Sequence, residues 1–423
     1  MKKVREGYKM SELGEIPEEW SIVKLSDLSQ KIGDGLHGTP KYVENSDYYF
    51  INGNNLVCGK VELYEDTKMV SEEDYIKNNK DLNENSLLIS LNGTIGNVAY
   101  YNNEKIMLGK SSGYINLKGN INKKYIYYVL KTNTVLEYFN KELTGTTIKN
   151  LSLSTLRNTP IPLPNIREQE KIALILSTVD EQIDNVDALI EKNKELKKGL
   201  MQTLLTKGIG HTKFKKTEIG EIPEEWEVKN LSEVVWYQEG PGLRKWQFTS
   251  AGIKVINVTN LVGNYLDLSN TSRYIDESEV EKKYKHFLID ENDIVVASSG
   301  NSWGKVSVVR KRDLPLLMNT SVIRFKSMKE EVSTEYLLQF LKSDIFKKQI
   351  SLLITGSAQP NFGPYHLDRT KIATPNINEQ LKIASILSEA DEKIKKYENN
   401  KQKLEELKKG LMQQLLTGKI RVI

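Results

Sequence analysis

The stretch SELGEIPEEW at residues 11–20 recurs as TEIGEIPEEW at residues 217–226, 206 positions further along the chain. Eight of the ten residues are identical, and both stretches end in the same acidic pair and tryptophan. A match of this length at so large a separation indicates an internal repeat. The sequence must therefore be searched for a duplication before any local structure is predicted.

Two later stretches repeat with a spacing of 211 residues. PNIREQ at 164–169 returns as PNINEQ at 375–380, and LKKGLMQ at 196–202 returns unchanged at 407–413. Repeats that keep their order across all 423 residues predict a tandem duplication, with two copies of one folding unit. The change in spacing from 206 to 211 indicates a net insertion of five residues in the second copy.

Between these repeated stretches the two copies differ. Residues 30–120 and 236–330 share only scattered matches. One interpretation is a single architecture that carries two different specificities. The alternative is ordinary drift of surface loops after duplication, and the sequence leaves both open.

The composition is typical of a folded protein, with 39% hydrophobic and 27% charged residues. No apolar run reaches the ~18–20 residues of a membrane span, and the basic N-terminus lacks the apolar core of a signal peptide. We therefore expect a cytoplasmic protein. The single cysteine, Cys58, excludes an internal disulfide. The net charge of +4 permits a polyanionic partner without indicating one.

Each copy ends in a pattern typical of a long helix. Asn165 with Glu168, and Asn376 with Glu379, fit a capping box, in which the Asn accepts from the backbone three residues on and the Glu reaches back. Apolar residues then alternate at spacings of three and four, as in the seam of a coiled coil. The predicted seam contains Ile172, Leu176, Val179, Ile183, Val186, Leu196 and Leu200 in the first copy and Ile383, Leu387, Ile394, Tyr397, Leu404, Leu407 and Leu411 in the second.

These narrow stripes predict that the two helices pack on each other as an antiparallel coiled coil. Equivalent helices of tandem copies are most simply related by a two-fold axis, which makes them antiparallel. The alternative is that each helix only closes the core of its own domain. Gly199 and Gly410 interrupt the helices and indicate either a close helix approach or a partner contact there.

The globular parts predict mixed α/β domains. Short β-branched runs at 86–90, 97–101 and 293–297 predict strands, whereas 125–138 and 336–346 predict helices. The predicted organisation is a first globular domain at 1–164, a first spacer helix at 165–207, a second globular domain at 208–375 and a second spacer helix at 376–423. The two globular domains are expected to be related by a pseudo-two-fold axis and separated by the two long antiparallel helices.

The sequence lacks the patterns of common catalytic sites. The four histidines have no ligand-like spacing, and neither a GxxxxGK[ST] phosphate loop nor a GxSxG elbow occurs. Glu195 and Lys197 have the Glu-x-Lys spacing of some nucleases, but this spacing is routine on a coiled-coil helix. We therefore predict neither a catalytic nor a metal site.

Gly-rich polar loops in the divergent regions offer side chains that read base edges. Asn and Gln pair with adenine, Arg and Lys with guanine, and Ser or Thr with either base, while Lys and Ser also bind phosphates. Each loop by itself is also typical of a plain turn. The candidate DNA-contacting residues are Asp34, His37, Thr39, Asn54, Asn55, Asn92, Thr94, Lys110, Ser111, Lys149, Arg244, Lys245, Gln247, Thr259, Asn260, Ser299, Asn301, Ser302, Lys305, Gln359 and Asn361.

Five motifs in order resemble those of a known family. The GEIPEEW openings, GDGLHGTP at 33–40, TGSAQPN at 355–361, the PNIxEQ helix starts and LKKGLMQ resemble the DNA specificity subunit of type I restriction-modification systems. The resemblance implies two target-recognition domains, each reading one half of a bipartite, asymmetric site in double-stranded DNA. The first copy departs from the pattern, with TGTTIKN at 144–150 where the second has TGSAQPN.

The same resemblance implies a non-catalytic subunit that holds two methyltransferase subunits and, through them, the restriction-translocase subunits. It implies no cofactor in this chain, since S-adenosylmethionine, ATP and Mg would be used by the partner subunits. The helices would set the gap between half-sites, so that inserting four residues, about 6 Å of helix, lengthens the gap by about two base pairs. The alternative function is a coiled-coil scaffold that clamps two protein partners without reading DNA. Such a scaffold would lack the steep salt dependence of phosphate contacts.

Overall fold

The computed structural model describes residues 4–143, 149–269, 271–328, 330–354 and 361–422. The chain divides into two compact units, one formed by Met1–Asp187 with Asn399–Ile423 and the other by Ala188–Glu398. We refer to them as the first and the second unit. Both divisions fall inside a long helix, so each unit contains one globular domain and a part of both helices. The domain boundaries given above follow the sequence copies and stay a prediction.

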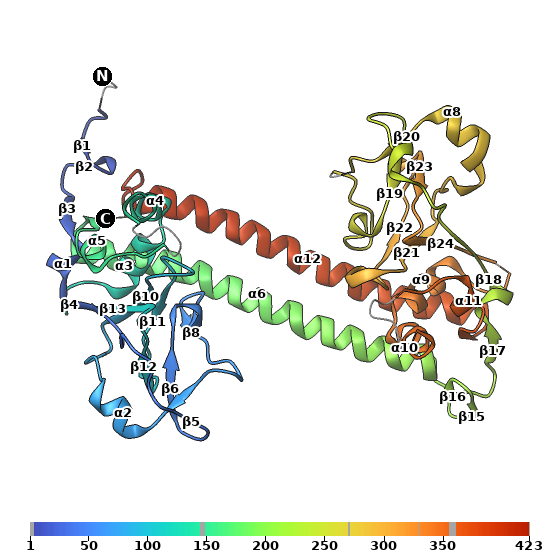
Figure 1. The fold of residues 1–423 in the computed structure, drawn as a ribbon, viewed down its shortest axis with the longest axis horizontal. Coiled ribbons are helices and arrows are strands. Elements are labelled where there is room, and N and C mark those ends of the chain that lie inside the picture. Colours follow the sequence, from blue (N-terminus) through green and yellow to red (C-terminus); the bar gives the residue numbers. More distant parts are fainter. Residues whose placement is uncertain (1–3, 144–148, 270, 329, 355–360, 423) are drawn as a thin grey trace. The chain divides into compact units, whose positions relative to one another are not determined.

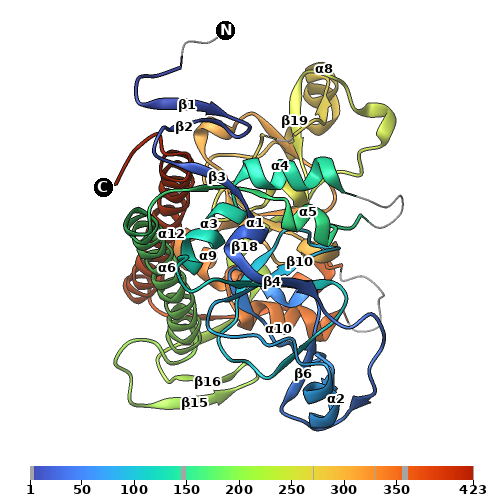
Figure 2. The ribbon, with the colours of Figure 1, turned by 90° about the vertical axis from the view of Figure 1, so that its left-hand side faces the viewer.

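The first unit contains two sheets that enclose a layer of apolar side chains, among them Ile51, Leu88 and Tyr114. The antiparallel large sheet has the order β11–β10–β13–β4, with bounds Val98–Tyr100, Ser86–Ser90, Ser112–Leu117 and Ser29–Asp34. The small sheet has the order β12–β6–β9–β5, with bounds Ile106–Leu108, Tyr48–Ile51, Met69–Val70 and Tyr42–Val43. Figure 2 views this unit, with the large sheet beside the helices.

Shorter strand pairs and helices complete the first unit. The pairs are β1 (Tyr8–Ser11) with β2 (Gly14–Pro17), β3 (Ser21–Lys24) with β14 (Pro160–Leu163), and β7 (Leu56–Val57) with β8 (Lys60–Val61). The helices are α1 (Leu25–Leu28), α2 (Glu72–Lys77), α3 (Lys123–Leu130), α4 (Asn133–Glu142) and α5 (Leu153–Arg157).

The second unit repeats the topology of the large sheet, while its small sheet has three strands where that of the first unit has four. Its large sheet has the order β18–β24–β21–β22, with bounds Val235–Glu239, Val322–Ser327, Ile294–Ala297 and Val306–Val308. Its small sheet has the order β20–β19–β23, with bounds Tyr274–Ile275, Ile253–Ile256 and Leu316–Met318. The predicted mixed α/β class is confirmed, and the three predicted strands correspond to β10, β11 and β21.

The remaining elements of the second unit also have counterparts in the first. The strands are β15 (Phe214–Thr217), β16 (Gly220–Pro223), β17 (Glu227–Asn230) and β25 (Lys371–Thr374). The helices are α7 (Leu231–Val234), α8 (Glu277–Glu279), α9 (Thr334–Lys342), α10 (Asp344–Leu353) and α11 (Pro364–Leu367).

Two predicted helices are each broken in two. The range 125–138 contains parts of α3 and α4, and the range 336–346 contains parts of α9 and α10. Thr132 Oγ1 accepts from Val135 N at 3.4 Å, and Ser343 Oγ accepts from Phe346 N at 3.2 Å. Each side chain therefore caps a new helix. The prediction of one continuous helix in each range is wrong. The apolar spacing continues across the capped break, so it does not reveal where one helix ends and the next begins.

The two long helices begin where the asparagines predict. α6 spans Ile166–Lys207 and α12 spans Ile377–Leu415, and within each unit their segments lie side by side (Figure 1). Glu168 N donates to Asn165 Oδ1 and Glu379 N to Asn376 Oδ1, both at 3.0 Å. The second helix ends at Leu415, so the described residues 416–422 are not part of the helix predicted to reach 423. Within the described ranges, no helix is long and apolar enough to cross a membrane.

Ion pairs show that the helices are antiparallel within each unit. In the first unit Asp180 pairs with Lys408, and Asp187 pairs with Lys401 at 2.7 Å. Seven residues forward on α6 thus correspond to seven residues backward on α12. In the second unit Lys197 pairs with Asp391 at 2.6 Å. Lys197 follows Asp187 by ten residues on α6, and Asp391 precedes Lys401 by ten residues on α12. The predicted antiparallel pairing is confirmed inside both units.

The helix ends also pack into the cores of the globular domains. The helices therefore pair with each other and, as in the alternative given above, also close the domain cores. The first core contains Ile172 and Leu176 from the start of α6 together with Leu415, the last residue of α12, and the following Leu416. The second core contains Leu204 and Leu205 from the end of α6 together with Ile383 and Leu387 from the start of α12. Each domain therefore depends on helical segments from both sequence copies.

One predicted seam residue in each helix is exposed. Leu196 is 55% exposed and its counterpart Leu407 is 50% exposed. The next residues, Lys197 and Lys408, turn toward the facing helix and bind Asp391 and Asp180. Consecutive helical residues point about 100° apart, so these leucines are turned away from the seam. The other predicted seam residues are buried or half-buried.

The two helix glycines do not mark a close helix approach. A Cβ atom at Gly199 or Gly410 would meet no other atom within 4 Å. That half of the prediction is therefore wrong. The alternative, a partner contact at these positions, stays a prediction.

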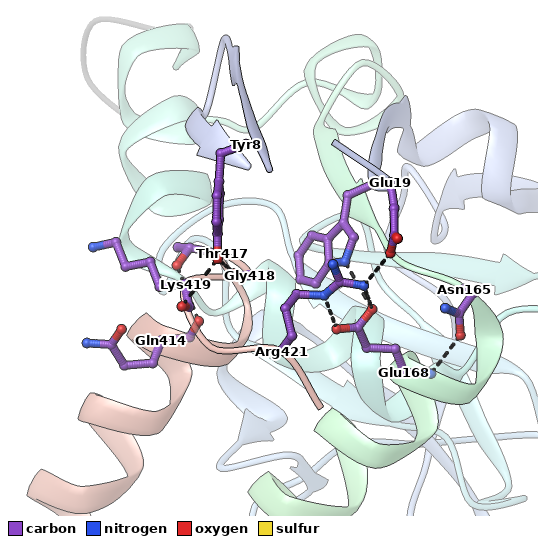
Figure 3. A network of polar contacts seen from close by, with 10 residues as sticks. Tyr8, Glu19, Asn165, Glu168, Gln414, Thr417, Gly418, Lys419 and Arg421 are labelled. Atoms are coloured by element: carbon purple, nitrogen blue, oxygen red, sulfur yellow. Dashed lines mark hydrogen bonds and ion pairs between the residues drawn. The ribbon is translucent and has the colours of Figure 1, made fainter. Parts of the chain in front are cut away.

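The start of each long helix is tied to the globular part by its buried glutamate. In the first unit Glu168 Oε2 accepts from Trp20 Nε1 at 3.1 Å, and Arg421 forms a bidentate pair with the same carboxylate at 2.6 and 2.9 Å (Figure 3). Arg421 also donates to Glu19 Oε2 at 2.8 Å. The glutamate of the predicted capping box thus makes tertiary contacts instead of reaching back to Asn165.

Candidate nucleic-acid interface

Three strands of the first unit's large sheet end or begin at one edge. β4 ends at Asp34, β10 ends at Ser90 and β13 begins at Ser112, and the register pairs Ser90 with Ser112 and Asp34 with Gly113. The loops next to this edge carry the candidate residues of the first copy. We refer to the loops at 34–41, 52–55, 92–97, 109–111 and 149–150 as the first loop surface.

Hydrogen bonds connect these loops to one another. Gly53 N donates to Ser111 Oγ at 2.9 Å, and Thr94 Oγ1 donates to Gly53 O at 3.2 Å. His37 Nε2 lies 2.6 Å from Asp34 Oδ2. The exposed candidate side chains are His37, Thr39, Asn54, Thr94, Lys110 and Lys149, and the half-buried ones are Asp34, Asn92 and Ser111. The structure therefore brings these predicted residues together on a preformed framework.

Two candidate asparagines have structural roles instead of exposed amides. Asn55 is buried, its Oδ1 accepts from Asn52 N at 2.9 Å, and its Nδ2 donates to Glu62 O at 2.8 Å. Asn260 is buried in the same way, with contacts to Asn257 N and Asp267 O, both at 2.9 Å. Each amide closes the turn that follows a strand of the small sheet. These side chains are not available to read bases in the arrangement described.

The second unit has an equivalent edge. β18 ends at Glu239, β21 ends at Ala297, and β24 begins at Val322, which pairs with Ala297. Ser299 forms a β-bridge with Asn361. We refer to the loops at 239–247, 257–260, 298–305, 319–321 and 361–363 as the second loop surface. Its exposed candidate residues are Arg244, Lys245, Thr259, Asn301, Lys305 and Asn361, and its half-buried ones are Ser299 and Ser302. Gln359 lies outside the described residues.

A single rigid turn carries the most exposed aromatic side chain of this surface. Gln247 is buried, its Oε1 accepts from Arg244 N at 2.9 Å, and its Nε2 donates to Glu279 Oε1 at 2.7 Å and to Tyr284 Oη at 2.9 Å. The candidate Gln247 therefore holds the turn in place. Trp246, between Lys245 and Gln247, is 79% exposed. The turn presents an indole ring beside two cations.

Sequence reasoning missed several groups at these surfaces. Trp246 was detectable as an aromatic residue inside a basic, Gly-rich loop. Asn97 and Asn140 line a cavity of about 650 Å³ together with the candidates Thr94 and Lys149. Asn140 lies on α4, so no loop pattern pointed to it. Glu239 ends β18, and burial raises the pKa of its carboxyl group.

The arrangement suits recognition by hydrogen bonds and charge. Among the described residues, no three His, Cys, Asp or Glu side chains come together as metal ligands. The two loop surfaces instead combine amides, hydroxyls and lysines over a fixed backbone, which are the groups that contact bases and phosphates. Both surfaces have the same topology and different exposed side chains.

The model of the family described as "Type I restriction modification DNA specificity domain" matches residues 17–197 and 223–409. The chain belongs to this family. Each matched range covers one sequence copy, so the specificity domain is present twice. The resemblance inferred from the five motifs is thereby confirmed.

Curated relatives match over nearly the whole chain. The Type I restriction enzyme MjaVIII specificity subunit of Methanocaldococcus jannaschii is 32% identical over 96% of this chain and 94% of the relative. The MjaIX specificity subunit of the same organism is 27% identical over 98% of this chain and 96% of the relative. The crystal structure of the S subunit of a type I restriction-modification system from M. genitalium matches with a TM-score of 0.56 at 19% identity, over 94% of this chain and 96% of that one. This last likeness shows the fold.

Proposed function

We propose that this chain is the DNA specificity subunit of a type I restriction-modification complex, in which each loop surface reads one half of a bipartite, asymmetric DNA site. The observation that carries the proposal is the pairing of one topology with two sets of exposed side chains. His37 and Thr94 stand on the first surface, where the corresponding loops of the second present Arg244 and Asn301. Different donors and acceptors on equivalent loops are what two different half-sites require.

In this proposal the chain recognises DNA and does not catalyse. S-adenosylmethionine, ATP and Mg would be bound by the partner subunits, as in the family that the motifs resemble. The loop side chains would supply base contacts and phosphate contacts only. A methylation or cleavage activity of the purified chain alone would contradict this part of the proposal.

Mapping methylated adenines in the genome that encodes the chain tests the DNA reading directly. We expect one asymmetric consensus with two half-sites separated by a gap. Binding of the full-length chain to a duplex with this consensus should weaken steeply with salt, because phosphate contacts release counterions. A chain that retains its protein partners but shows no salt-dependent DNA binding would support the scaffold function instead.

The two exposed leucines of the LKKGLMQ repeats support a docking surface for methyltransferase subunits in each unit. Leu196 lies one turn from Gly199 on α6, and Leu407 lies one turn from Gly410 on α12, with open space beside both glycines. An exposed leucine beside a glycine offers apolar area that a partner helix can approach closely. The repetition of this pattern fits two copies of one partner.

Charge substitution tests this docking surface. Leu196→Asp and Leu407→Asp should each reduce the bound methyltransferase subunits from two to one, as measured by the mass of the assembled complex. Leu352→Asp is the matched control, because Leu352 is 76% exposed on α10 outside the repeat. Two bound subunits in both variants would exclude these leucines as docking positions.

A further inference from the structure

Five lysines surround a cavity of about 590 Å³ in the second unit. Lys194, Lys197 and Lys198 come from the second half of α6, Lys342 from the end of α9 and Lys348 from α10. In the described part of the chain, Asp344 is the acidic residue that lines the same cavity. This lysine cavity is separate from the second loop surface, since none of its lining residues belongs to those loops.

Two of these lysines share one carboxylate in a poorly hydrated position. Lys197 Nζ lies 2.6 Å from Asp391 Oδ1, and Lys342 Nζ lies 3.6 Å from Asp391 Oδ2. The three side chains are only 16%, 14% and 18% exposed. Burial lowers the pKa of Lys342, and the nearby charge of Lys197 lowers it further, while Asp391 raises it. One carboxylate cannot balance two partly buried ammonium groups.

The other charges leave the excess in place. Lys198 Nζ lies 3.8 Å from Asp344 Oδ2, and Lys194 Nζ lies 2.9 Å from Glu191 Oε1. In the described part of the chain, five lysines and one aspartate therefore line the cavity. Ser343 and Asp344, at the N-terminus of the ten-residue α10, also line the cavity. A helix N-terminus adds partial positive charge.

The first unit keeps the framework of this site and lacks the charge excess. Positions shift by 211 residues between the copies, so Lys348 corresponds to Glu137, and Lys194 corresponds to Glu405. Lys131, the counterpart of Lys342, donates to Tyr127 Oη at 2.9 Å. The fold is thus formed with two glutamates in place of two of the lysines. The positive charge in the second unit is not needed for packing.

We propose that the lysine cavity binds a phosphate group, supplied either by the backbone of bound DNA or by a free phosphorylated molecule. A phosphate offers several acceptor oxygens and up to two negative charges, which suits a cavity lined by five lysines and one aspartate. Lysine binds phosphate as a flexible point charge, so several lysines converge on one anion without a fixed fork geometry.

Pyrophosphate binding to the full-length chain tests the site. Calorimetric titration at matched ionic strength should show binding to the wild type, and K194E/K348E should weaken it about tenfold or more, because two attractive charges become repulsive. This variant installs the residues that the first unit already carries at 405 and 137. Lys409→Glu, at the first unit's counterpart of Lys198, is the matched control and should leave binding unchanged. If K194E/K348E fails to fold, Lys348→Gln serves as the milder variant, with a several-fold loss expected.

A DNA titration distinguishes the two sources of phosphate. If the DNA backbone supplies the group, K194E/K348E should also reduce the slope of log affinity against log salt by about one or two contacts, at ~0.9 per contact. If a free molecule supplies it, pyrophosphate binding should be lost while the DNA salt slope stays the same. Absence of specific pyrophosphate binding by the wild type, or equal binding by wild type and variant, would overturn the proposal. Neither result depends on whether the loop surfaces read bases.

Discussion

In both units a buried glutamate at the start of a long helix accepts from a tryptophan, and the additional donors differ between the units. In both, a tryptophan Nε1 donates to the buried glutamate at 3.1 Å, from Trp20 to Glu168 and from Trp226 to Glu379. The first unit adds the bidentate guanidinium of Arg421. The second adds His211 Nε2 and the backbone Ile209 N, both 2.9 Å from Glu379 Oε1. The duplication thus retained the buried carboxylate and its indole partner, while the residues after each helix satisfy it in two ways.

In the first unit the permanently charged guanidinium of Arg421 pairs with the buried carboxylate of Glu168. Hydrogen bonds to Glu168 raise the pKa of Arg421, with Glu19 contributing less. A base whose pKa is raised by folding stabilises the fold at every pH below its unfolded value, and this contribution is lost only as the pH rises through the folded value. Arg421 therefore acts equally across the physiological range.

The largest effect is expected from Arg421→Ala. The substitution leaves the fully buried Glu168 without its charged partner, and we expect the free energy of unfolding of the first unit to fall by about 2–4 kcal/mol. Urea denaturation of the full chain measures this change. Lys105→Ala, which removes an exposed ion pair with Asp47, is the control and should cost less than about 1 kcal/mol. Equal losses in the two variants would show that the Arg421 pair does not stabilise the junction.

Trp246→Ala sharpens the comparison of the loop surfaces. Trp20 is the only tryptophan of the first copy and is buried, whereas Trp246 is exposed beside Arg244 and Lys245. If the ring contacts a base edge, we expect about tenfold weaker binding to the mapped site, within the ~1–3 kcal/mol of a good base contact. Fluorescence anisotropy measures the affinity, and Trp246→Phe should recover part of it. Leu352→Ala is the control, and an unchanged affinity in Trp246→Ala would exclude a base contact by the ring.

His211→Ala should have a smaller effect than Arg421→Ala. Glu379 keeps its hydrogen bonds from Trp226 and from the backbone of Ile209, so we expect a loss of about 1–2 kcal/mol in the second unit. The same urea experiment compares the Arg421–Glu168 and His211–Glu379 contacts in one chain. A loss as large as that of Arg421→Ala would mean that the other two hydrogen bonds to Glu379 do not compensate for the loss of His211.

The smallest effect is expected from Tyr8→Phe. Tyr8 Oη donates to Gly418 O at 2.9 Å, and the second copy has Phe214 at the matching position of its hairpin. Removing this hydroxyl should cost about 0.5–1.5 kcal/mol, the usual net value of one hydrogen bond. Thermal unfolding detects it as a drop of a few degrees or less. A drop in melting temperature as large as that of Arg421→Ala would show that the contact of the β1–β2 hairpin with Gly418 contributes more stability than one hydrogen bond explains.

The candidate site was predictable where recognition depends on local sequence. Polar loops next to β-branched runs gave most of the exposed side chains, because a strand end and its loop are neighbours in the chain. Asn55 and Asn260 show where this reasoning fails, since loop composition cannot tell an exposed amide from one that closes its own turn. Asn140 was missed because its proximity to Thr94 arises only from packing.

The duplication, the mixed α/β class, the starts of both long helices and the antiparallel pairing could be inferred from sequence, because repeats, caps and apolar periodicity are visible without tertiary contacts. The partners of the buried charges follow from packing. Glu168 binds Trp20 and Arg421, which lie 148 and 253 residues away, and Lys197 displaces Leu196 from the seam because Asp391 faces it. A periodic pattern records which positions are apolar, but only packing determines which charge is opposite which.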